Sequence, residues 1–129
     1  MEWLRITTST ELVRVATDEI VYVRADGNYS DLVLTNGKSR KMTFQLHFFD
    51  EVFQRLHNNM FVRVGRSLIV NKRYIYVINL TEQQLILFGG AMKEAITFYG
   101  QPTLKQPRDI TMSRDGLKKL MELLEDEKE

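Results

Sequence analysis

The chain has 129 residues, of which 43% are hydrophobic and 27% charged, with a formal net charge of +1 and no cysteine. This length and composition fit one globular domain with a hydrophobic core. They exclude a disulfide framework and a thiolate metal site, and no apolar run is long enough to span a membrane. The start, MEWLRITTST, lacks the pattern of a signal peptide, so we expect a cytoplasmic protein.

The small net charge hides blocks of one sign. No acid lies between Asp31 and Asp50 or between Glu51 and Glu82, although both intervals contain lysine and arginine. The last eight residues, ELLEDEKE, instead hold five acids and one lysine. Acid-free blocks indicate either a surface that faces a polyanion or a solvated face whose acids come from other parts of the fold.

The first third of the chain has β-branched and aromatic residues in the pattern of strands. The predicted strands are ELVRVA (11–16), EIVYVRA (19–25), YSDLVLT (29–35) and SRKMTF (39–44). Between them, Asp26-Gly27-Asn28 and Asn36-Gly37-Lys38 are signals of tight turns, because glycine and asparagine tolerate positive φ.

From Thr43 the apolar residues recur at helical spacing. One stripe of the predicted helix consists of Leu46, Phe49, Phe53 and Leu56. Thr43 is the predicted N-cap, and Asn58-Asn59 is the predicted stop.

The second half begins with FVRVGRSLIVNKRYIYVI (61–78), a β-rich run with four basic residues and no acid. The runs at 74–80 and 83–88 predict a hairpin that turns at Thr81-Glu82. Residues 89–108 form an extended connection, for which an extra hairpin, a dimer contact and a disordered loop stay open. A short strand at 109–112 precedes a final helix with Ser113 as its N-cap. The residues alone therefore predict one mostly β domain over 1–129, with one central helix, a C-terminal helix and an acidic tail at 122–129.

Three segments together resemble the LytTR family of bacterial DNA-binding domains: DEIVYVRADGNYSDLVL (18–34), FVRVGRSLIVNKRYIYVI (61–78) and ITMSRDGLKKL (110–120). That family has an aromatic-rich strand leading into a G-N-Y turn, an F-x-R-x-H-R-S-x-x-V-N signature, and a Ser-Arg step that opens the last helix. The core of the signature stands here as Arg63, Arg66, Ser67, Val70 and Asn71. The resemblance runs from about Leu12 to Leu120, which it implies is the core of the domain, at about 12–120.

The chain departs from the family pattern in two places. Gly65 replaces the usual histidine, which removes one polar group for a phosphate and is expected to free the loop. Residues 89–108 are longer than the usual connection. The receiver domain that often precedes this module does not fit ahead of Leu12, so we expect no control by phosphorylation in cis unless the chain is a fragment.

The resemblance implies an elongated domain of small, packed antiparallel sheets whose inter-strand loops enter successive major grooves from one side of the duplex. By position, the loops are 27–30 and 65–67 and the turn at 113–114. The candidate DNA-binding residues are Asn28, Ser30, Arg63, Arg66, Ser67, Ser113 and Arg114. The candidate phosphate contacts are Lys38, Arg40, Lys72 and Arg73.

Each candidate also has a purely structural interpretation. Arg66 either contacts DNA, where its planar fork can bond guanine or phosphate, or pairs with an acid of the protein. Arg63 either contacts phosphate or packs its stem, and Asn28 either contacts DNA or serves the backbone of its turn. We expect Tyr29 to pack and Asn71 to cap the turn before Tyr74.

We therefore predict a transcriptional regulator that binds double-stranded DNA specifically, at paired direct repeats, with a homodimer as one possible state. It is expected to need no cofactor, metal, membrane or small-molecule substrate. An enzyme is not indicated, because His47 and His57 lack metal-site spacing and no glycine-rich phosphate loop precedes a helix. The alternative is a protein-interaction module of the same fold; RNA binding is less favoured, since no paired aromatic platform is present.

Overall fold

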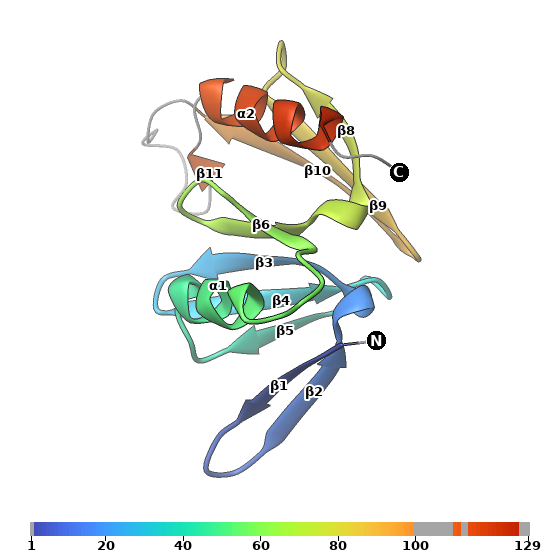
Figure 1. The fold of residues 1–129 in the computed structure, drawn as a ribbon. Helices are drawn as coiled ribbons and strands as arrows, with labels where there is room; N and C mark the ends of the chain where they lie inside the picture. The colour runs from blue at the N-terminus through green and yellow to red at the C-terminus, as the bar shows by residue number, and fades with distance from the viewer. Residues whose placement is uncertain (1, 100–109, 112–113, 127–129) are drawn as a thin grey trace.

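The strands in the described part of the chain form three small sheets that follow one another along the molecule (Figure 1). The computed structural model describes residues 2–99, 110–111 and 114–126. The first sheet is the hairpin of β1 (Trp3–Thr7) and β2 (Leu12–Ala16). β2 matches the predicted first strand, whereas its partner β1 was not predicted.

The second sheet has five strands in the order β5-β4-β3-β7-β6, and every neighbouring pair is antiparallel. These strands are β3 (Ile20–Asp26), β4 (Tyr29–Leu34), β5 (Ser39–Met42), β6 (Phe61–Val64) and β7 (Leu68–Asn71). The pairing of β3 with β7 joins strands that are far apart in the sequence. It places the middle of the chain beside its first third.

One face of this sheet packs against the central helix α1 (Leu46–Gln54) and the β1–β2 hairpin (Figure 1). The apolar stripe points into this core, with Leu46, Phe49 and Phe53 buried. The helix is shorter than predicted: its N-cap is Gln45, without a side-chain capping bond, and it ends before Leu56. The predicted N-cap at Thr43 is therefore wrong, because the chain is still bending away from β5 there.

The third sheet has the order β11-β10-β9-β8 and carries the C-terminal helix α2 (Arg114–Glu125). Its strands are β8 (Ile75–Asn79), β9 (Gln84–Gly89), β10 (Met92–Tyr99) and β11 (Ile110–Thr111). Buried residues of this sheet and of α2 join the other face of the five-stranded sheet in a second core. The predicted 81–82 hairpin is β8–β9, and of the alternatives for 89–108 the structure shows a hairpin, β9–β10, up to residue 99.

Two short 3-10 helices, Thr17–Glu19 and Lys72–Tyr74, lead into β3 and β8. The second is capped by Asn71, whose side-chain Oδ1 accepts from the Arg73 backbone N–H at 3.0 Å. The amide of Asn71 also donates to the Ile20 carbonyl at 2.9 Å, and its side chain is fully buried. The prediction that Asn71 caps the turn is confirmed.

Candidate nucleic-acid interface

Two of the predicted contact turns lie side by side at one end of the five-stranded sheet. The β3–β4 turn contains Gly27 and Asn28, and the β6–β7 turn runs from Gly65 to Ser67. The Ala25 N–H donates to the Ser67 carbonyl at 2.8 Å, which fastens one turn to the other. In Figure 1 both turns, and the start of α2, are on the same side of the molecule. We call this side the turn edge.

Gly65 gives the β6–β7 turn its shape. Its φ of +71° is in the left-handed region, which a residue with a Cβ adopts only with strain. The chain reverses there, and Arg66 follows on the exposed tip. Within the described part of the chain, the Arg66 guanidinium has no ion pair and no hydrogen bond. Among the described residues, Arg66 therefore does not pair with an acid, which was the alternative interpretation.

Arg63 does not point away from this turn but folds onto it. Its Nη2 donates to the Arg66 carbonyl at 3.0 Å and its Nε to the Gly65 carbonyl at 3.3 Å. Its Nη1 is 3.6 Å from Oδ2 of Asp50 on α1. The turn therefore has internal hydrogen bonds although glycine stands at position 65 in place of the family histidine.

The β3–β4 turn is held in a different way. Gly27 has φ +63°, and the exposed Asn28 accepts a hydrogen bond from Gln45 Nε2 at 3.2 Å. Tyr29 is 47% exposed, so the expectation that it packs is wrong. Ser30, in contrast, is fully buried and donates to the Phe44 carbonyl at 2.8 Å. A hydroxyl in that position has a structural role and does not reach the surface.

Several predicted phosphate contacts lie at the other end of the sheet. β4 runs away from the turn edge to the Asn36–Lys38 turn, and β7 runs away from it to Lys72 and Arg73. A six-residue strand spans about 20 Å. Lys38, Lys72 and Arg73 are therefore not brought together with Arg66.

Basic side chains of the acid-free blocks find acids from elsewhere in the fold. Arg40 pairs with Glu11 at 2.6 Å, and Arg73 pairs with Asp18 at 3.3 Å. Lys41 pairs with Asp26 and Asp31. For these side chains the structure supports a solvated face whose acids come from other parts of the fold, and not a surface of unbalanced positive charge.

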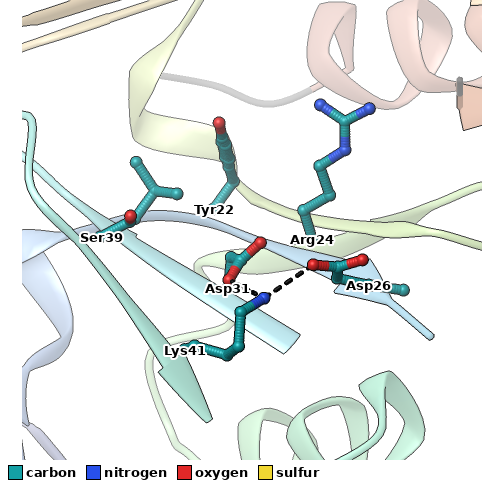
Figure 2. A pocket seen from close by; sticks show the side chains of 8 residues that line it. Tyr22, Arg24, Asp26, Asp31, Ser39 and Lys41 are labelled. Carbon is teal, nitrogen blue, oxygen red and sulfur yellow. Dashed lines mark hydrogen bonds and ion pairs between the residues drawn. The ribbon is translucent and has the colours of Figure 1, made fainter. Parts of the chain in front are cut away.

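Lys41 lies in a hollow of about 390 Å³ on β3, β4 and β5 (Figure 2). The hollow is on the face of the sheet that also contributes Tyr22 and Val33 to the second core. Its Nζ is 2.7 Å from Asp26 and 3.0 Å from Asp31. These hydrogen bonds raise the pKa of Lys41. Asp26 adjoins the Asn28 turn, so Lys41 balances acidic charge beside the turn edge.

Tyr22, which also lines this hollow, makes a hydrogen bond that joins the two larger sheets. Tyr22 on β3 donates through its hydroxyl to Oε2 of Glu94 on β10 at 2.6 Å. Burial, followed by the bond to Glu94, raises the pKa of Tyr22. The bond links β3 to β10, and so the five-stranded sheet to the third sheet.

The family assignment rests on the sequence itself. The family model of the LytTr DNA-binding domain matches residues 10–98. The chain belongs to the LytTR family. A solved LytTr DNA-binding domain from Bacillus cereus has the same fold, with a TM-score of 0.60 and 17% identity over 96% of this chain and 97% of that one. No curated protein matches the sequence significantly.

LytTR membership makes this chain a DNA-binding domain of the response-regulator type, and its partner class is double-stranded DNA. Of the family signature, Arg66 and Ser67 lie on the turn, Arg63 supports it and Asn71 is in the core. At the third predicted region, Ser113 lies outside the described residues. Arg114 begins α2, which packs against β6.

Two other features of the described segments bear on the function. Neither helix in residues 2–99 or 114–126 has the length and apolar character of a membrane span. The same segments hold no cluster of three or more His, Cys, Asp or Glu side chains suited to a metal ion.

Gln45 and Asp50 contact the two turns from the N-cap and the middle of α1, and neither was among the predicted site residues. Both are far from their partners in the sequence. A contact between residues so far apart in the sequence leaves no local sequence pattern from which it could be predicted.

Proposed function

We propose that this LytTR domain binds a specific double-stranded DNA sequence and regulates transcription, with the two turns of the turn edge entering the major groove. The observation that carries the proposal is the exposed Arg66 on a turn that Arg63 holds by hydrogen bonds, without an internal partner for the Arg66 side chain among the described residues. Arginine in such a place can donate two parallel hydrogen bonds to guanine O6 and N7.

The proposed contact set follows from the placement of each candidate. Asn28, Arg66 and Ser67 belong to it because they lie on the turn edge, and Arg114 belongs to it because α2 starts on that side, where backbone N–H groups favour a phosphate (Figure 1). Ser113 stays with Arg114 as a proposal from the family pattern. Ser30, Lys38, Lys72 and Arg73 are left out, the first for its burial and the others for their position.

The test begins with selection of bound duplexes from a random DNA pool. Affinity for the best selected duplex is then measured by fluorescence anisotropy over a salt series. Affinity should fall steeply with salt, and Arg66→Ala should cost about 1–3 kcal/mol on the selected duplex. Arg55→Ala is the matched control, since Arg55 is exposed and lies at the end of α1 remote from Gln45 and the turn edge.

Two outcomes would contradict the proposal. Equal competition by random and selected duplexes would exclude specific readout. Equal losses for the Arg66 and Arg55 variants would exclude Arg66 as a base contact. Duplexes with one and with two copies of the selected element, in direct orientation, would test the proposed paired repeats.

A protein-interaction module is the second candidate, and one surface favours it. On the third sheet, Tyr76 is 69% and Phe88 54% exposed, with ring centroids 5.8 Å apart. Such a pair suits a protein contact, including that of a homodimer. Absence of DNA binding at low salt, together with self-association that is lost in Tyr76→Ser, would favour this candidate.

A further inference from the structure

Arg63 and Asp50 are connected to the β6–β7 turn, although neither residue lies on it. Arg63 is on β6, and its guanidinium donates to the carbonyls of Gly65 and Arg66 at 3.3 and 3.0 Å. Those two carbonyls belong to the peptide units on either side of the Arg66 Cα, from which the Arg66 side chain projects. A planar guanidinium can bond both at once, which a lysine ammonium does less well.

Asp50 connects this guanidinium to the helix. Its Oδ2 is 3.6 Å from Arg63 Nη1, and the pair is only partly exposed, at 36% for Arg63 and 28% for Asp50. One turn further along α1, the ring of Phe53 stacks on Phe61 of β6, with centroids 3.9 Å apart and planes 9° apart. The stack fixes the helix against the strand, so Asp50 presents its charge to Arg63 from a rigid position.

The turn itself needs such support. Its residues lie beyond the strand ladder, and Gly65 brings the greatest backbone freedom of any residue. A side chain on a mobile turn would lose more conformational entropy when it binds a base edge. A turn that is ordered before DNA arrives avoids that loss.

We propose that Arg63 and Asp50 form a brace that positions Arg66 for DNA, with Arg63 as a positioning residue and Asp50 as its anchor. The inference rests on the proposed function of Arg66. It assigns a DNA-binding role to an acid, which simple electrostatics would not do. Removing a carboxylate normally strengthens the attraction to a polyanion, whereas removing this one weakens specific binding.

The experiment compares Asp50→Asn with Glu51→Gln, which removes the same charge from the next, exposed residue of α1. Each variant is measured on the selected duplex and on a random duplex. We expect Asp50→Asn to weaken binding to the selected duplex by about two- to fivefold, as for a partly exposed ion pair. Glu51→Gln should leave that affinity unchanged or tighten it slightly, and both variants should behave alike on the random duplex.

Arg63→Lys and Arg63→Ala separate a brace from a phosphate contact. For a brace, both variants weaken specific binding and leave the salt dependence of affinity unchanged. For a phosphate contact, Arg63→Lys retains binding and Arg63→Ala lowers the salt slope by about one. The Ala25 amide, which donates to Ser67, adds a readout without DNA: its hydrogen exchange should quicken in Asp50→Asn and not in Glu51→Gln.

The outcomes also separate this inference from the proposed function. If the wild-type protein prefers the selected duplex but Asp50→Asn and Glu51→Gln behave alike on it, the brace is refuted and the proposed function stands. If the wild-type protein shows no preference, the proposed function fails and the positioning role fails with it.

Discussion

Replacement of Asn71 by alanine should destabilise the fold without removing a DNA contact. Asn71 belongs to the family signature, but it is fully buried at the end of β7. It makes two short hydrogen bonds, 2.9 Å to the Ile20 carbonyl and 3.0 Å from the Arg73 N–H, and a longer one of 3.5 Å to the Thr17 carbonyl.

The expected loss follows from those bonds. Each short bond contributes about 1 kcal/mol, and a backbone group left buried without a partner costs about 1–3 kcal/mol. Asn71→Ala should therefore lower the free energy of unfolding by about 2–4 kcal/mol. The total stability of a domain is about 5–15 kcal/mol, so most of the protein should remain folded at low temperature.

Urea unfolding followed by circular dichroism measures the effect. The midpoint should fall by about 1–2 M with little change in the slope m. DNA affinity, measured well below the unfolding transition, should stay near that of the wild type. The reasoning would be refuted by a variant of normal stability that has lost DNA binding, because Asn71 would then act at the interface.

Three further predictions test the turn, the sheet contact and the charge balance. Gly65→Ala should cost about 1–2 kcal/mol of stability, since φ is +71° there, and unchanged urea midpoints would contradict this strain. Tyr22→Phe should cost about 1 kcal/mol at pH 7 by removing the bond to Glu94, as thermal unfolding would show. Because folding raises the pKa of Tyr22, the free energy of unfolding of the wild type should also fall above pH ~10. The Tyr22→Phe variant should lose less stability over the same pH range, and equal losses in the two proteins would contradict this. Arg40→Gln should change stability by less than about 1 kcal/mol, because its pair with Glu11 is exposed, and a larger change in urea unfolding would be evidence against that view.

The sequence by itself determined the local features of this protein. Alternation of β-branched residues predicted the strands, and the glycines at 27 and 37 predicted turns where the structure shows positive φ. The signature around Arg66 led to the LytTR family, which the family model confirms. These features depend on neighbouring residues, so they can be recognised along the chain.

Only the tertiary structure decided which side chains meet. The pairing of β3 with β7 brings the Asn28 and Arg66 turns together, and sends Lys38 and Arg73 to the other end of the sheet. The burial of Ser30 and the contact of Asp50 with Arg63 arise from the packing of α1 and the chain leading into it. The dihedral angles and the apolar pattern of a strand are local properties, whereas its neighbour in the sheet depends on contacts between distant segments.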